Sequence, residues 1–168
     1  NWCKLMNGFF EHTPDSLRAW CVDHGMPAFA AKQVFDWVYA KQVIDPALMT
    51  NLSENHRALL AEALTIDQGR LLADQHATDG TRKLLVGWKN PSAGLPILDS
   101  GPSTETVLIP ANNRLTACVS SQVGCPVGCA FCASGLEGLE GNLTAGQIVE
   151  QVHRLGRLGL GRVSNVVF

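Results

Sequence analysis

The feature that most restricts how this chain folds is the segment C-P-V-G-C-A-F-C, which places Cys125, Cys129 and Cys132 within eight positions. Free cysteines are usually buried singly, so three of them spaced by glycine and proline cannot all fill one core. Around them the pattern predicts a strand over 115–120, a capped helix over 144–158 and a buried, apolar strand over 163–168. The cysteine segment therefore follows the carboxyl end of a strand in a β-α-β unit, where α/β folds place their sites.

The rest of the chain predicts helices first and strands later. Helix signals begin at Thr13, near Ala28 and at Ser53, and none of these helices carries a catalytic constellation. Short segments rich in Leu and Val then predict strands over 70–76, 83–88 and 104–109, with a hairpin turn at Asp79-Gly80. The predicted fold class is α/β in three parts: a helical accessory module over 1–68, a connecting β-hairpin region over 69–110, and the cysteine-bearing part over 111–168.

Composition limits the classes of function. The chain of 168 residues is 46% hydrophobic and 17% charged, which predicts a buried core. Its formal net charge of -2 does not favour binding of nucleic acid by the protein surface as a whole, so any contact with RNA would involve a local basic patch. No apolar run approaches the roughly 20 residues of a membrane helix. No export signal stands at the start, so we expect a soluble, cytoplasmic protein.

The six cysteines allow several interpretations; they are Cys3, Cys21, Cys118, Cys125, Cys129 and Cys132. Three disulfides are disfavoured because four cysteines lie within fifteen positions and no export signal is present. Cys21 reads as a core residue. Structural zinc needs four ligands, usually in two pairs, and here only Cys129 and Cys132 form a C-x-x-C pair, with Cys118 as a possible fourth ligand. A thioredoxin-like dithiol leaves Cys125 unexplained.

An iron–sulfur cluster fits the segment better. Thiolates are the usual cluster ligands, and Gly124 and Gly128 give the backbone freedom to approach the sulfides. Three ligands on a four-iron cluster leave one iron open. An open coordination position distinguishes catalytic from structural sites in zinc proteins, and the same logic favours catalysis here.

The surrounding motifs resemble a known family. C-x-x-x-C-x-x-C with Phe131 before the last cysteine resembles the signature of radical S-adenosylmethionine (SAM) enzymes. The longer stretch R-L-T-A-C-V-S-S-Q-V-G-C-P-V-G-C-A-F-C is similar to the RlmN/Cfr family of RNA adenine methyltransferases. So are D-G-T-R-K-L-L-V-G (79–87), A-K-Q-V-F-D-W-V-Y (31–39) and M-T-N-L-S (49–53), and the resemblance runs from about residue 13 to the end.

The resemblance implies a role for several residues. Cys125, Cys129 and Cys132 match the ligands of a [4Fe-4S] cluster, and Phe131 beside them belongs to the cofactor-binding site for the cluster and SAM. Glu105 matches the family's general base. Cys118 matches the thiol that resolves a covalent enzyme–RNA intermediate through a transient disulfide bond. Without the resemblance, Glu105 would be interpreted as a solvated strand residue and Cys118 as a residue of the hydrophobic core.

The resemblance also implies an architecture and an activity. The module over 1–68 would engage RNA, and residues 111–168 would begin a partial (β/α) radical SAM barrel that is incomplete here. The enzyme would methylate an adenine carbon, C2 in preference to C8, of 23S ribosomal RNA and also of transfer RNA. It would act through a methyl-cysteine intermediate. A flavodoxin or ferredoxin would supply electrons, and the protein would be a cytoplasmic monomer.

Some features depart from the family pattern. The methyl-carrying cysteine and most SAM-holding residues have no counterpart, so we expect a truncated, N-terminal half that holds a cluster without completing methylation. Leu139 and Gly141 replace a usual aromatic residue and a usual arginine. Two alternatives stay open: a non-catalytic iron–sulfur or zinc module that uses Cys118 as fourth ligand, and a radical SAM enzyme with another substrate.

Overall fold

A computed structural model describes residues 8–88, 101–112, 114–136 and 138–168. The chain divides into two compact units, Asn1–Gln68 and Gly69–Phe168. Cys3 lies outside the described residues. No helix in the described ranges is long and apolar enough to cross a membrane. The three functional parts predicted from the sequence, with boundaries at 68 and 110, stay a prediction.

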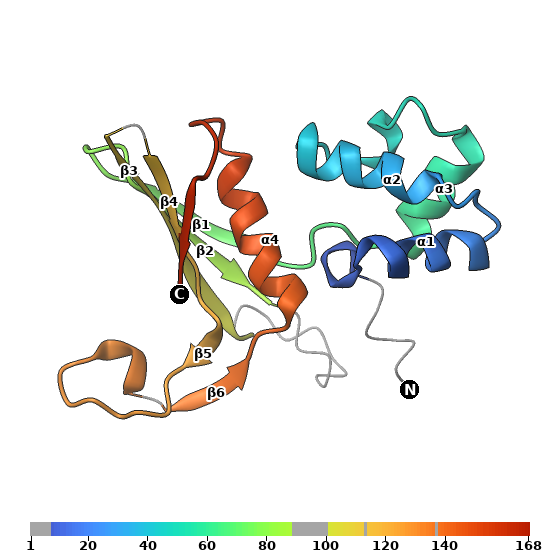
Figure 1. The fold of residues 1–168 in the computed structure, drawn as a ribbon. Helices are drawn as coiled ribbons and strands as arrows, with labels where there is room; N and C mark the ends of the chain where they lie inside the picture. The colour runs from blue at the N-terminus through green and yellow to red at the C-terminus, as the bar shows by residue number, and fades with distance from the viewer. Residues whose placement is uncertain (1–7, 89–100, 113, 137) are drawn as a thin grey trace. The chain divides into compact units, whose positions relative to one another are not determined.

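The first unit is helical (Figure 1). Its elements are η2 (Phe9–Glu11), α1 (Pro14–Asp23), α2 (Ala30–Phe35), η3 (Asp36–Ala40), η4 (Pro46–Leu48) and α3 (Glu54–Ala63). Thr13 caps α1, since its hydroxyl accepts a hydrogen bond from the Ser16 backbone N–H at 3.2 Å. Ser53 caps α3 in the same way. Both predicted helix starts are therefore confirmed.

The helix expected from about Ala28 to Gln42 is not one regular α-helix. α2 continues into a π-turn, η3, in which the Lys41 N–H donates to the Asp36 carbonyl five residues earlier. Gln42 then takes a positive φ of 59°, which ends the helical path. Cys21 is fully buried in the core of this unit, as predicted, and this burial raises the pKa of its thiol.

The second unit is built on a five-stranded sheet of order β1-β2-β3-β4-β7. Its strands are β1 (Arg70–His76), β2 (Arg82–Gly87), β3 (Ser103–Ala111), β4 (Arg114–Cys118) and β7 (Asn165–Val167). The first four are antiparallel neighbours, whereas β7 is parallel to β4. The β1–β2 turn is the predicted one: Gly80 has a φ of 86° and the Asp79 carboxylate accepts from the Thr81 N–H at 2.9 Å.

Helix α4 (Ala145–Gly156) makes the crossover between β4 and β7, so the predicted β-α-β unit is confirmed. Thr144 and Gln147 form a capping box at its start, also as predicted. Figure 1 shows α4 lying along one face of the sheet. That face is the hydrophobic core of the unit; its buried residues are Leu84, Val86, Trp88, Leu108, Ala117, Val119 and Leu155.

The last predicted strand differs from expectation in its burial. It was expected to be a buried strand over 163–168, but Val166, Val167 and Phe168 are 41%, 45% and 79% exposed. The physical reason is its position: β7 is an edge strand of the described sheet and pairs on one side only, with β4.

A buried ion pair ties α4 to the start of β1. Glu150 is fully buried, and its Oε1 accepts a hydrogen bond from the Gly69 N–H at 2.9 Å. The Arg154 guanidinium lies 2.8 Å from the same oxygen and also donates to the Gly69 carbonyl. Every one of these polar groups therefore has a partner, as a buried charge requires.

We predict that Arg154→Leu destabilises the second unit by about 3–5 kcal/mol, because it leaves the Glu150 carboxylate buried without its cation. Denaturant unfolding measures the loss. Arg114→Leu is the matched control, since Arg114 is exposed and has no ion pair within the described residues. Equal losses in the two variants would contradict a structural role for the buried pair.

Candidate functional site

The cysteine loop, residues 125–138, leaves the sheet at the carboxyl end of β4 and is closed by a short stem. The stem consists of β5 (Gln122–Gly124) and β6 (Leu139–Asn142), which pair antiparallel and extend beyond the main sheet in Figure 1. The Leu143 N–H donates to the Ser121 carbonyl at 3.0 Å, below the last pair of the stem. The two ends of the loop are therefore held side by side.

Glycine is required where the stem meets the loop. Gly124 has a φ of 74°, and a Cβ added there would lie 2.0 Å from the carbonyl oxygen of Gly138. The Cys125 N–H donates to that same oxygen at 2.9 Å. Gly128, between the first two cysteines of the loop, also has a positive φ, of 64°. The backbone freedom expected of Gly124 and Gly128 is thus used at both positions.

The three cysteines of the loop are free, half-buried thiols. The Cys132 N–H donates to the Cys129 carbonyl at 3.1 Å, which makes a tight turn around the C-x-x-C pair, and the Phe131 ring inside this turn is 93% exposed. The turn continues into η5 (Ala133–Gly135). Cys125 lies on the same loop, but in the described ranges no three His, Cys, Asp or Glu side chains form a group that could hold a metal ion. The ligand roles of the cysteines stay a prediction.

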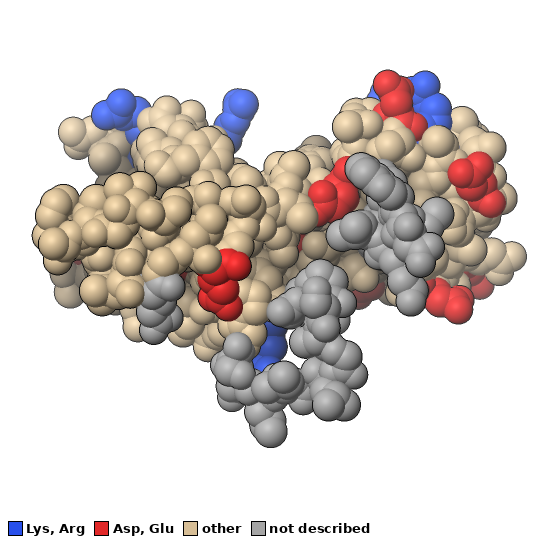
Figure 2. Space-filling model, turned by 90° about the horizontal axis from the view of Figure 1, so that it is seen from below, with Lys and Arg blue, Asp and Glu red and all other residues tan. Residues whose placement is uncertain are grey.

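No disulfide links the cysteines that the structure describes. Cys21, Cys118, Cys125, Cys129 and Cys132 are all free. The surface around the loop is also poor in charge: Figure 2 shows the side of the sheet unit that carries β5 and β6 with few Lys, Arg, Asp or Glu side chains. A thiol-rich, weakly charged loop is chemically suited to soft metal ions and iron–sulfur clusters rather than to hard cations.

Glu105 and Cys118 lie on one face of the sheet. Cys118 ends β4 and pairs directly with Val107 of β3, and Glu105 is two residues before Val107 on the same strand. Because side chains alternate along a strand, all three lie on the face opposite α4. The Ser120 hydroxyl, just beyond β4, donates to the Glu105 carbonyl at 2.9 Å. The two predicted catalytic residues therefore share a face near the point where the cysteine loop leaves the sheet.

The sequence analysis missed two residues that contact this region. Lys83 of β2 forms an ion pair with Glu105, with Nζ 2.8 Å from Oε1. Lys83 lies in the D-G-T-R-K-L-L-V-G motif, but only the strand register brings it to Glu105. Gln151 of α4 is fully buried, and its side-chain amide bonds both backbone groups of Ser120, at 3.0 Å to N–H and 2.9 Å to C=O. A lone glutamine in a helix gives no sequence signal of such a contact.

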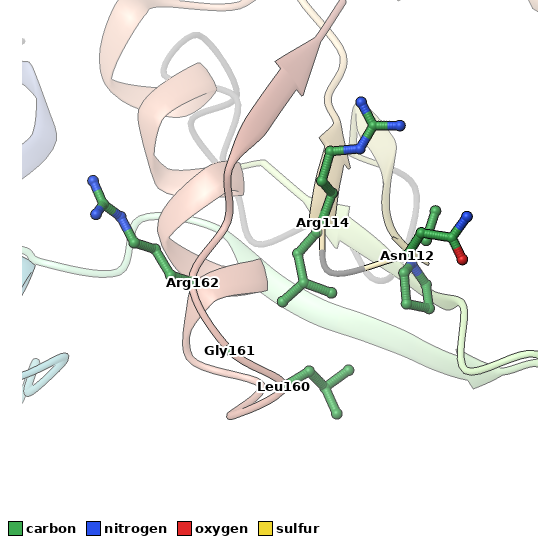
Figure 3. Close-up of a pocket in the computed structure, with 8 residues that line it drawn as sticks. Asn112, Arg114, Leu160, Gly161 and Arg162 are labelled. Carbon is green, nitrogen blue, oxygen red and sulfur yellow. The ribbon is translucent and has the colours of Figure 1, made fainter.

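A cavity of about 420 Å³ lies at the other end of β4, between the β3–β4 turn and the segment that follows α4 (Figure 3). Leu160, Gly161 and Arg162 form one side, and Asn112 and Arg114 lie on the other. None of the predicted site residues lines it. The predicted site is therefore an open sheet face and a loop rather than this cavity.

We predict that Gln151→Leu lowers the free energy of unfolding of the second unit by about 1–3 kcal/mol. The substitution leaves the N–H and C=O of Ser120 without their buried partner, at the base of the cysteine loop. Thermal and denaturant unfolding measure the loss, and hydrogen exchange at Ser120 should accelerate. Gln122→Leu, in the stem, is the control. Gln147→Leu does not serve as a control, because Gln147 belongs to the capping box of α4. Unchanged exchange at Ser120 would show that the amide contact does not hold this segment.

Comparison with known proteins extends over nearly the whole chain. Residues 8–66 match the family model described as the ribosomal RNA large subunit methyltransferase N-terminal domain. A probable dual-specificity RNA methyltransferase RlmN of Thermotoga neapolitana is 40% identical over 97% of this chain and 45% of its own length. The dual-specificity RNA methyltransferase RlmN of Jannaschia sp. is 43% identical over 83% of this chain and 34% of its own length.

A solved structure also matches. The crystal structure of a radical SAM methyltransferase from Sphaerobacter thermophilus superposes with a TM-score of 0.83 and 35% identity, over 96% of this chain and 46% of that one. The mixed α/β fold with a helical amino-terminal part is therefore confirmed. The chain spans less than half the length of these relatives.

Proposed function

Because the chain is a homologue of the RlmN family of radical SAM RNA methyltransferases, we propose that the enzyme of which these 168 residues form part methylates an adenine carbon of RNA. The observation that carries the proposal is the cysteine loop, which connects β4 to α4 in the parallel β4–α4–β7 unit. The chain that holds this loop aligns with a relative of the family over 97% of its length. The substrates would be 23S ribosomal RNA and transfer RNA, with C2 favoured over C8. Flavodoxin or ferredoxin would supply the electrons.

The cysteine loop fits the cofactor that this function needs. Cys125, Cys129 and Cys132 would bind a [4Fe-4S] cluster through their thiolates, and all three are free and half-exposed. The exposed Phe131 ring would contact the SAM bound beside it. When bound, the cluster and SAM supply the radical that methylation of an adenine carbon requires, since that carbon is not a nucleophile.

Two residues of the open sheet face would act on the RNA. The Glu105 carboxylate, 57% exposed, would accept a proton from the methylated ring carbon. The Cys118 thiol, on the same face, would release the RNA by forming a transient disulfide with the family's methyl-carrying cysteine. That cysteine has no counterpart in these 168 residues, so we expect them to hold a cluster without completing methylation.

The helical unit offers a surface for RNA. A groove of about 810 Å³ is lined by Phe29, Phe35 and Tyr39 together with Arg18 and Lys32. The Phe35 and Tyr39 rings are stacked, with centroids 5.6 Å apart, and Phe29 is 65% exposed. Aromatic rings beside cations bind unpaired bases and phosphates of RNA.

We predict that Cys125→Ala abolishes cluster binding, while Cys118→Ala leaves it intact. The chain is purified without oxygen and reconstituted with iron and sulfide, and both elements are counted; about four of each per chain is expected for the parent and for Cys118→Ala. Added SAM should perturb the spectrum, because one iron is open. Loss of the cluster in Cys118→Ala, or one zinc without sulfide, would favour the non-catalytic metal module instead.

We predict that Phe29→Ala weakens binding of the chain to a 23S ribosomal RNA fragment by about tenfold, the loss of one stacked base. Fluorescence anisotropy at fixed salt measures the affinity. Val22→Ala is the control, since Val22 is also exposed, at 55%, but does not line the groove. Equal affinities for both variants would remove the groove from the RNA-binding surface.

A further inference from the structure

Strand register places Lys83 on the same face of the sheet as Glu105 and Cys118. Lys83 pairs with Val107 of β3, and Val107 pairs with Cys118 of β4, so the three residues form one row across the sheet. With strands about 4.8 Å apart, Lys83 and Cys118 are roughly 10 Å apart along this row. Glu105 lies two residues before Val107, diagonal to both ends of the row. Glu105 therefore lies on the strand between those that carry Lys83 and Cys118, and on the same face as both.

Lys83 contacts only one of the two carboxylate oxygens of Glu105. Lys83 Nζ lies 2.8 Å from Oε1 of Glu105, and within the described residues Oε2 has no partner. An exposed glutamate without a partner samples several rotamers, whereas a proton acceptor must present its lone pair at a fixed place. The ammonium restricts the rotamer through one oxygen and leaves the second oxygen open to the substrate.

We propose that Lys83 is a positioning residue that holds Glu105 so that Oε2 takes the proton from the RNA ring carbon. The C–H electron pair stays with the ring, and Lys83 keeps its own proton throughout. The proposal rests on the proposed function, because it assumes that Glu105 is the proton acceptor. It adds the group that fixes where the acceptor oxygen lies.

If this ion pair only stabilised the fold, its loss should change the free energy of unfolding very little. Both side chains are solvent-exposed, at 39% for Lys83 and 57% for Glu105, and exposed pairs change stability only slightly. The neighbouring Arg82 also forms a cross-strand ion pair from β2, but with Asp74 of β1 and on the other face of the sheet. Arg82→Gln therefore reports what the loss of a cross-strand ion pair does without any effect on Glu105.

The test uses the full-length enzyme loaded with its cluster, and the variants Lys83→Gln, Lys83→Arg and Arg82→Gln. In single turnovers, Lys83→Gln should form methylated RNA about tenfold more slowly than the parent, with unchanged RNA affinity and unchanged SAM cleavage. The covalent protein–RNA adduct should accumulate, seen as a slow band on a denaturing gel. Lys83→Arg should recover only part of the rate, since it restores a cation at Glu105 but its planar guanidinium can bind both carboxylate oxygens.

Several outcomes would overturn the proposal. An unchanged rate in Lys83→Gln, an equal defect in Arg82→Gln, or loss of RNA affinity without adduct would each show that Lys83 does not act through Glu105. Failure of the proposed function is distinguishable, because the parent enzyme would then methylate no RNA, or Glu105→Gln would remain fully active.

Discussion

Helix α4 fixes the geometry of the sheet unit through two adjacent side chains that are both polar and both fully buried. Glu150 binds the backbone at Gly69, where β1 begins, and Gln151 binds the backbone at Ser120, just after β4 ends. A buried polar group that loses its partner costs free energy, so only one register of the helix along the sheet satisfies both. An apolar helix face alone would tolerate sliding. The parallel β4–β7 pairing and the exit path of the cysteine loop both depend on this register.

The same helix separates the two faces of the sheet by role. The face under α4 is hydrophobic and carries residues such as Val86 and Leu108, which are fully buried. The opposite face carries Lys83, Glu105 and Cys118, which are partly exposed. Strand alternation assigns each residue to one face without ambiguity, so a shift of one residue in register would bury the charges and expose the core. The reactive groups are thus positioned by the packing on the other side.

Local signals in the sequence predicted most of the elements. The capping box at Thr144, the turn at Asp79-Gly80 and the β-α-β order depend on short-range chemistry that a single sequence displays. The cysteine spacing predicted the loop, and the motifs pointed to the family of RNA methyltransferases that the chain is similar to.

What the sequence did not reveal depends on contacts between distant segments. The Lys83–Glu105 pair spans 22 residues and the Gln151–Ser120 contact spans 31, and neither has a local signature. The exposure of β7 was missed for a related reason, since an apolar run shows that a strand is suited to burial but not whether a neighbour covers it. The π-turn at Asp36–Ala40 was also missed, because the apolar spacing of a helix does not distinguish a short π-turn from an α-helical turn.

The exposed β7 edge has a practical consequence for handling the protein. A parallel edge strand that pairs with no described strand on its outer side, next to exposed valine and phenylalanine side chains, is a template for pairing with a strand from another molecule. Concentrated solutions of these 168 residues should therefore self-associate through this edge in a concentration-dependent manner. Spectroscopic work on the isolated chain is best done dilute, or with a charged residue placed at Val166 to discourage that pairing.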